Sequence, residues 1–199
     1  YALEGSVFIG GAVLQWLRDE LKILERTADS DRIAASIPDT GGVYLVPAFA
    51  GLGAPHWDMY ARGTLVGLTR GTGRAQIIRA ALEAIAYQCA DVVAAMQADH
   101  PQPLDLLRAD GGASANDFLL QFQADILGCR IERPACMEST AQGAAALAAL
   151  ALGWQTPASL ARRAAERTFT PAMPAEQRQQ RLAGWREAVA RARNWARPE

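Results

Sequence analysis

Hydrophobic residues recur along the chain with two periods, and these periods predict alternating strands and helices. Steps of three and four residues, typical of a helix with one buried face, run over 14–24, 78–96 and 119–126. An alanine-rich run at 144–152 predicts a further, closely packed helix that Gly153 ends. Short apolar runs bounded by Gly, Pro or Asp predict strands at 1–8, 43–46, 65–68, 104–107 and 129–132.

The order of these elements predicts an α/β layered domain, with a mixed sheet and helices on both of its faces. Ser139, with Gln142 three residues later, matches a capping box at the start of the alanine-rich helix. Toward the C-terminus the chain becomes rich in arginine, and 161–199 is typical of two amphipathic helices. We therefore predict one α/β domain over 1–155 and a C-terminal helical tail over 156–199 that packs on it.

The stretch 104–127, LDLLRADGGASANDFLLQFQADIL, is the most informative part of the sequence. It predicts a buried strand, a sharp turn at Gly111 and Gly112, and then a helix. Asn116 or Asp117 can cap that helix. Without a Cβ, the glycines allow a ligand to approach the backbone next to a helix N-terminus. Two interpretations stay open at this point: a plain strand-to-helix turn, or a place where a nucleotide lies.

A second glycine pair, Gly10 and Gly11, begins the helix over 14–24. Such a pair allows either close packing against a neighbouring element or a phosphate near the helix N-terminus. Gln15 lies one turn beyond Gly11 on the same side, where its amide can form a hydrogen bond. The polar residues 27–40, which include several aspartates, predict a solvated turn or a short helix.

The segment 47–63, PAFAGLGAPHWDMYARG, is long for a loop in a compact domain and is therefore a candidate functional loop. We interpret His56 as a packing or hydrogen-bonding residue, because no carboxylate or nucleophile is visibly paired with it. Asp58 and Arg62 are spaced to pair and fix the loop. Glu83, beside the buried face of the following helix, is either a partly buried carboxylate with a local partner or an edge residue.

Composition narrows the possible partners and the compartment. Half of the 199 residues are hydrophobic and 21% are charged, as in a globular protein. The net charge of −1 predicts no nucleic acid and no anionic membrane as partner, and no apolar run predicts a membrane span. Three cysteines without metal-like spacing indicate reduced thiols in a cytoplasmic protein. Because the chain begins with Tyr1 and reads as the middle of a domain, we expect a piece of a longer protein.

The run from Gly63 to Glu83, GTLVGLTRGTGRAQIIRAALE, resembles the second signature of the FGGY carbohydrate kinases. That pattern is long and has a fixed gap, so it is more specific than a glycine pair. Every position that it specifies fits, namely Gly63, Leu65, Gly67, Leu68, Gln76, Ile77, Ala80, Ala81, Leu82 and Glu83.

The rest of the chain resembles the members of this family that phosphorylate glycerol. The resemblance covers essentially the whole chain, including the opening YALEGSVFIGG, the long loop, the DGGASAN stretch and the tail over 169–195. His56 and Met59 depart from it, because Tyr and Pro are more typical there. Neither residue lies in the nucleotide motifs, so the implied class of activity stands.

The resemblance implies a fold, a ligand and a reaction. Members have two actin-like, ribonuclease-H-like domains with ATP and Mg²⁺ in the cleft between them, and this chain is similar to most of the second domain. By resemblance, Gly112 and Asn116 lie along the adenosine, and Gly11 and Gln15 approach the ribose or the phosphates. The implied reaction transfers the γ-phosphoryl group of ATP to glycerol, largely through positioning and charge neutralisation by the metal.

The resemblance also implies parts that this chain lacks. These are an N-terminal domain with a phosphate-binding hairpin, the catalytic base, the glycerol contacts and the opening strands of the second domain. We therefore expect the chain by itself to be inactive and to aggregate or associate unless the missing part is present. We expect the complete protein to be a homo-oligomer. Two alternatives remain: an FGGY kinase for a pentulose or gluconate, and a non-catalytic binding module with the same fold.

Overall fold

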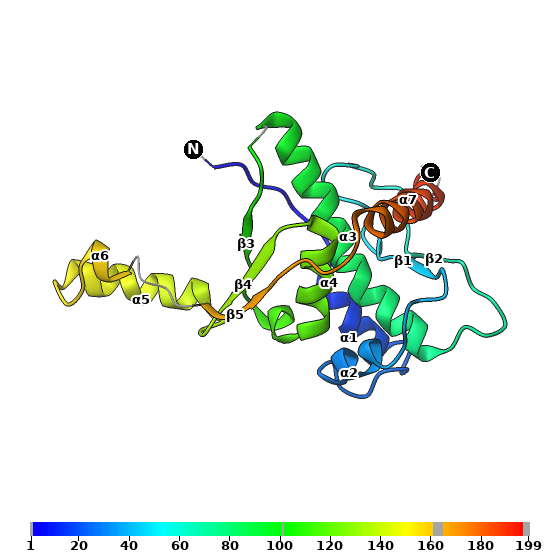
Figure 1. Cartoon of the computed structure of the whole chain (residues 1–199), viewed down its shortest axis with the longest axis horizontal. Coiled ribbons are helices and arrows are strands. Elements are labelled where there is room, and N and C mark those ends of the chain that lie inside the picture. The colour runs from blue at the N-terminus through cyan, green and yellow to red at the C-terminus, as the bar shows by residue number, and fades with distance from the viewer. Residues whose placement is uncertain (1, 101, 161–164, 197–199) are drawn as a thin grey trace.

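The structure, a computed structural model, describes residues 2–100, 102–160 and 165–196. Helices and strands alternate in a body from which one helical segment projects (Figure 1). The helices are α1 (Ala12–Asp19), α2 (Asp29–Ala35), α3 (Arg74–Asp99), α4 (Asp117–Leu127), α5 (Ser139–Ala151), α6 (Pro157–Leu160) and α7 (Ala175–Ala192), with a 3₁₀ turn η1 (Gly112–Ala115). The strands are β1 (Tyr44–Val46), β2 (Thr64–Val66), β3 (Leu106–Arg108), β4 (Arg130–Pro134) and β5 (Ala165–Phe169).

Helix α3 lies at the centre of the main hydrophobic core. Most of its predicted apolar face is buried, and Ile78 and Leu82 are completely inaccessible to solvent. Cys89 and Met96, further along this face, are only partly buried. Burial extends around the whole helix over 78–88, because α1, α2, α4 and β1 all contact it. Alanines within this stretch allow these neighbours to approach closely. The helical period therefore identified one buried face correctly but did not show how many elements surround the helix.

The strands form two small sheets. In the first, β1 and β2 pair antiparallel, with Tyr44 opposite Val66. In the second, β4 lies between β3, to which it is parallel, and β5, to which it is antiparallel. This is the mixed sheet of an α/β fold. Helix α4 covers one face of it, and Leu120 shares a buried cluster with Ile131 and Phe169.

Two predicted elements differ from the structure at the ends of the chain. The strand predicted at 1–8 is wrong, because residues 2–8 pair with no strand in the described part of the chain. Two amphipathic helices were predicted in the arginine-rich tail, on either side of 169–174. The second is α7, but 165–169 is strand β5 instead of the first, and 161–164 lie outside the described residues. Pairing with β4 supplies backbone hydrogen bonds to 165–169, and this tertiary context overrides the local helical pattern.

Two helix boundaries also differ from the prediction. Helix α1 ends at Asp19, although the leucine spacing continues to Leu24. Leu24 lies in the loop after α1, and its side chain is buried in the core. The predicted capping box at Ser139 is wrong: Ser139 is already the first helical residue, Glu138 is the N-cap, and no side chain caps α5. In both cases hydrophobic spacing or a short motif located a helix without fixing its ends.

The alanine-rich helix exists as α5, but it is not closely packed as predicted. No residue of α5 or α6 is buried. Figure 1 shows these two helices projecting from the body beyond the ends of β4 and β5. Leu147, Leu152 and Trp154 on this segment are 70%, 61% and 78% exposed. Alanine favours a helix, but its small side chain does not identify a packing partner.

The long loop 47–63 is fixed by hydrogen bonds to α3 and to the end of the chain. His56 Nε2 lies 3.2 Å from Asp91 Oδ2 on α3, so His56 is a hydrogen-bonding residue as interpreted. The expectation that no carboxylate pairs with it is wrong, because Asp91 comes from a distant helix. The predicted Asp58–Arg62 pair is wrong, because Asp58 accepts backbone N–H groups of Tyr60, Ala61 and Asn194. Arg62 donates instead to backbone carbonyls of the loop.

The signature residues of 63–83 form β2, a tight turn and the first half of α3. Gly67 has φ +81°, and a Cβ there would lie 2.1 Å from the carbonyl oxygen of Gly42, so only glycine fits. The side chain of Gln76 accepts the Gly73 backbone N–H at 3.0 Å and caps α3. Glu83 is a fully buried carboxylate with local partners, as one of the two interpretations predicted.

Helices long and apolar enough to cross a membrane are absent from 2–100, 102–160 and 165–196. The three cysteines are free thiols. Burial raises the pKa of the Cys89 and Cys129 thiols, which therefore stay protonated at neutral pH.

We expect the Asp58→Asn variant of the full-length protein to melt at a lower temperature at neutral pH. Its amide cannot accept all three backbone N–H groups, and the loss of one such bond in a buried position costs about 2 kcal/mol. In a domain of this size each kcal/mol corresponds to roughly 2–4 °C in melting temperature.

The difference between Asp58→Asn and the wild type should shrink as the pH falls. Burial opposes ionisation of Asp58, but the N–H groups of Asn194, Tyr60 and Ala61 and the charge of Arg193 outweigh it and lower its pKa. The extra stability is therefore present above the unfolded pKa of about 3.9 and is lost as the pH falls through the lower folded value. Melting curves from pH 7 to 3 check this, with Asp99→Asn at an exposed position as the control. A constant difference would contradict it.

Candidate functional site

The four residues proposed for a ligand line one cavity. It has a volume of about 400 Å³, within the range of small-molecule sites. Gly11 and Gln15 reach it from α1, Gly112 from η1, and Asn116 from the start of α4. The remaining wall comes from α2 and the residues just before it. The complete lining is Gly11, Leu14, Gln15, Thr27, Ala28, Asp31, Gly112, Ala113, Ala115 and Asn116.

The start of α1 lies against η1 at one side of the cavity. A Cβ built on Gly11 would lie 3.5 Å from Cβ of Ala113, which is ordinary van der Waals contact. A side chain as small as alanine would therefore fit at position 11, and packing alone does not require glycine there. The side chain of Gln15, one turn further on, is exposed and lines the cavity. Its amide is accessible to a ligand as donor and as acceptor.

The turn at Gly111 and Gly112 brings bare backbone to the cavity. Gly111 has φ +81°, a conformation that residues with a Cβ rarely adopt. Its carbonyl accepts the Ser114 hydroxyl at 2.7 Å and its N–H donates to Met137 at 2.9 Å, so the turn is fixed on both sides. A Cβ on Gly112 would meet no protein atom within 4 Å. The space beside Gly112 is therefore open to a ligand.

Asn116 caps α4 and joins it to α2. Its Oδ1 accepts the Leu119 backbone N–H at 2.8 Å, and its Nδ2 donates to Ser30 Oγ at 3.1 Å. Asn116 rather than Asp117 is therefore the cap. A second bond between the two helices runs from the Phe118 backbone N–H to Asp31 Oδ1 at 2.7 Å. An amide nitrogen carries two hydrogens, so one donor of Asn116 has no partner within the described part of the chain and is available to a ligand.

The charge of the cavity is low and negative. Asp31 is the single charged residue among its lining residues, and neither Lys, Arg nor His lines it. A phosphate beside Asp31 would meet a like charge without a counter-charge. The N-terminus of α1 at Gly11 carries the positive end of a helix dipole and is the most favourable edge for an anion. The arrangement suits an uncharged polar group in the cavity better than an anion.

Sequence reasoning missed the wall formed by Thr27, Ala28 and Asp31. This segment was interpreted as a solvated turn or a short helix, and the helix is α2. The signal available was a cluster of polar residues, which is also typical of exposed surface. Only contact with α4, through Ser30 and Asp31, shows that the segment faces a cavity.

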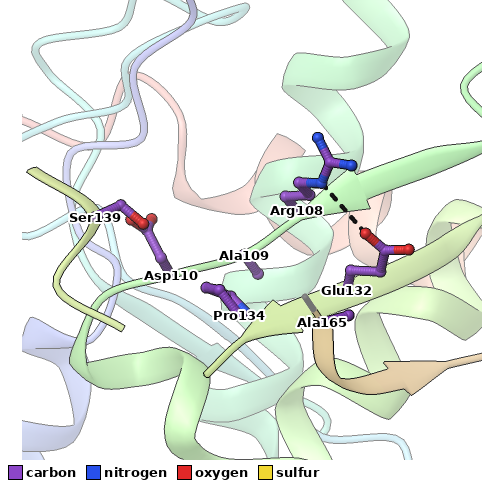
Figure 2. Close-up of a pocket in the computed structure, with 7 residues that line it drawn as sticks. All are labelled: Arg108, Ala109, Asp110, Glu132, Pro134, Ser139 and Ala165. Atoms are coloured by element: carbon purple, nitrogen blue, oxygen red, sulfur yellow. Dashed lines mark hydrogen bonds and ion pairs between the residues drawn. The ribbon is translucent and has the colours of Figure 1, made fainter. Parts of the chain in front are cut away.

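A second cavity, of about 220 Å³, lies beside β3, β4 and β5. Figure 2 shows the residues that line it. Arg108 and Glu132 occupy directly paired positions on β3 and β4, and their side chains bond at 3.2 Å. Asp110 and Ser139 lie away from this pair in the view of Figure 2. The charges of Arg108 and Glu132 balance each other, and no residue proposed for a ligand lines this cavity. It is therefore the weaker candidate.

The described residues do not form a metal site by themselves. Across 2–100, 102–160 and 165–196, no three His, Cys, Asp or Glu side chains gather closely enough to hold an ion. Asp31 stands without a second acidic residue among those that line the first cavity.

Comparison with known proteins places the chain in a family. Residues 1–152 match the model of the FGGY family of carbohydrate kinases, C-terminal domain. The chain therefore belongs to this family, and its α/β fold is that of the actin-like second domain.

Within the family, the chain is similar to proteins named glycerol kinase. The chain is 64% identical to glycerol kinase of Symbiobacterium thermophilum and 58% identical to glycerol kinase of Petrotoga mobilis, each over 98% of this chain. It spans 40% of the length of these curated relatives.

Among solved structures, a glycerol kinase is more similar to this chain than a xylulose kinase is. The crystal structure of Plasmodium falciparum glycerol kinase with ADP superposes with a TM-score of 0.87 at 36% identity, over 96% of this chain and 38% of that one. A ligand-bound xylulose kinase from Lactobacillus acidophilus superposes with a TM-score of 0.72 at 26% identity, over 94% and 38%.

Replacing Asn116 by Ala should destabilise the full-length protein by about 1 kcal/mol, because α4 loses its N-cap. The Asn116→Asp variant keeps an acceptor for the Leu119 N–H and places a negative charge at the helix N-terminus, so its melting temperature should fall less. Thermal unfolding of the two variants checks the assignment, and equal losses would contradict it.

Proposed function

We propose that the full-length protein containing this chain transfers the γ-phosphoryl group of ATP to glycerol, giving glycerol 3-phosphate. The identity of 64% to a glycerol kinase over nearly the whole chain is the observation that carries this proposal. The higher TM-score with a glycerol kinase than with a xylulose kinase supports glycerol over a pentulose. As part of the proposal, 1–155 form the second kinase domain and 156–199 form its tail.

In this proposal the chain supplies the nucleotide side of the cleft. Adenosine lies in the cavity with Gly112 and Asn116 along it, and Gly11 and Gln15 lie toward the ribose or the phosphates. Three observations support this arrangement: open space beside Gly112, a free amide hydrogen on Asn116, and the absence of a cation from the lining. The single negative charge favours the neutral nucleoside in the cavity and the phosphates outside it.

The chemistry of transfer needs groups outside this chain. A base on the glycerol hydroxyl and the glycerol contacts belong to the proposed N-terminal domain. Because the described residues offer no metal site, Mg²⁺ enters the proposal only as the ion that accompanies ATP. What this chain contributes is orientation of the nucleotide and exclusion of water on one side. The homo-oligomer and the cytoplasmic location stay predictions.

A substrate panel tests the proposed reaction. We expect the full-length protein to form ADP with glycerol, with a kcat/KM at least about 100-fold above the values for xylulose and gluconate. The chain alone should form no product, because it lacks the base. A preference for xylulose or gluconate would indicate another sugar kinase. Absence of turnover with all three would favour a non-catalytic module, and either result overturns the proposal.

The Gly112→Ala variant tests the placement of adenosine. Its methyl group enters open space in the free protein, so stability should hardly change, but it would occupy room that the nucleoside needs. A steric cost of about 1.4 kcal/mol corresponds to a tenfold rise in the KM for ATP, with the KM for glycerol unchanged. Gly143→Ala on α5, where a Cβ also meets no atom within 4 Å, is the matched control. An unchanged KM for ATP in Gly112→Ala would exclude this placement.

A further inference from the structure

Arg79 is a buried cation that does not line the cavity and has no part in the function proposed so far. Its side chain is 9% exposed, and its Nε donates to Glu83 Oε1 at 2.8 Å along α3. Its Nη1 donates to the carbonyl oxygen of Ala34 at 3.2 Å and also to that of Ile37. Arg79 therefore connects α3 to the C-terminal end of α2.

Arg79 donates hydrogen bonds to backbone carbonyl groups at the C-terminal end of α2. The last carbonyl groups of any helix lack partners within the helix, and a cation there is favourable because of the helix dipole. Helix α2 has seven residues, and its C-cap, Ser36, does not take the left-handed conformation that often satisfies such carbonyls. The guanidinium of Arg79 fills this role from a neighbouring helix.

Arg79 also contacts the first turn of α4. Its guanidinium carbon lies 4.8 Å from the centre of the Phe118 ring. The backbone N–H of Phe118 is the group that donates to Asp31 on α2. One side chain thus contacts both helices on either side of the cavity, and these helices carry Asp31 and Asn116.

We infer that Arg79 is a positioning residue for the nucleotide: from outside the cavity it sets the distance between α2 and the start of α4. The inference rests on the proposed function, because it assigns Arg79 to the same nucleotide site. A guanidinium suits this role because it donates in its plane while its face lies on an aromatic ring. A lysine ammonium cannot do both.

The variant that tests Arg79 must keep its positive charge, because Glu83 is a buried carboxylate that depends on its neighbours. Arg181 on α7 donates to Glu83 Oε2 at 3.4 Å, and the Tyr87 hydroxyl donates to the same oxygen at 3.4 Å. Burial raises the pKa of Glu83, while the two arginines favour its charged form. Removing a positive charge would leave this carboxylate undercompensated in the core. Lysine keeps the charge, so Arg79→Lys removes the fork and the stacking without that cost.

Steady-state kinetics of the full-length protein test the inference with Arg79→Lys and a matched control, Arg181→Lys. Arg181 donates to the same carboxylate, and its guanidinium carbon lies 5.8 Å from the centre of the Phe122 ring. It has no hydrogen bond to α2 among the described residues. We expect Arg79→Lys to raise the KM for ATP about tenfold or more, with kcat within about threefold and the KM for glycerol unchanged. Arg181→Lys should change the KM for ATP by less than about twofold.

Amide hydrogen exchange gives a second readout, in which residues 29–37 should exchange faster in Arg79→Lys than in Arg181→Lys. An unchanged KM for ATP in Arg79→Lys overturns the inference, and so do equal rises in both variants, which would indicate general destabilisation. Failure of the proposed function is seen separately, in the wild type, as absence of ATP-dependent turnover and of ATP binding, and the inference would then fail with it.

Discussion

The carboxylate of Glu83 is the charge around which the main core is arranged. Its side chain is 2% exposed, and arginines from α3 and α7 compensate it. Breaking such a buried pair costs about 3–5 kcal/mol, because the remaining charge loses its partner inside the core. Arg79, which pairs with Glu83, also bonds to the end of α2, and Arg181 joins α7 to Glu83. The position of three helices therefore depends on one acidic residue.

The family signature identifies the domain although none of its residues lines the cavity proposed for the nucleotide. The lining of the cavity comes from α1, α2, η1 and α4, and no residue of the signature run 63–83 belongs to it. Gly67 permits a turn against Gly42, Gln76 caps α3, and Glu83 pairs with Arg79. The signature describes the support on which the site is built.

Sequence patterns predicted most strands and helices of the body, because burial on one face leaves a period that can be read directly. Through the resemblance to the FGGY family they also named four of the ten residues that line the first cavity. They did not predict that 165–169 would form a strand or that α5 would be unburied, since both depend on which element lies alongside. The wall at Asp31 was missed for the same reason: a polar segment looks alike whether it faces solvent or a cavity.

The tryptophans of this chain differ sharply in their surroundings. The indole of Trp185 is 1% exposed and donates to Asp91 at 2.7 Å, whereas Trp57, Trp154 and Trp195 are 72%, 78% and 70% exposed. A soluble quencher such as acrylamide would therefore extinguish the red-shifted emission of the three outer indoles first. The emission that survives would come largely from inner indoles such as Trp185, and its wavelength would report directly on whether α7 is docked.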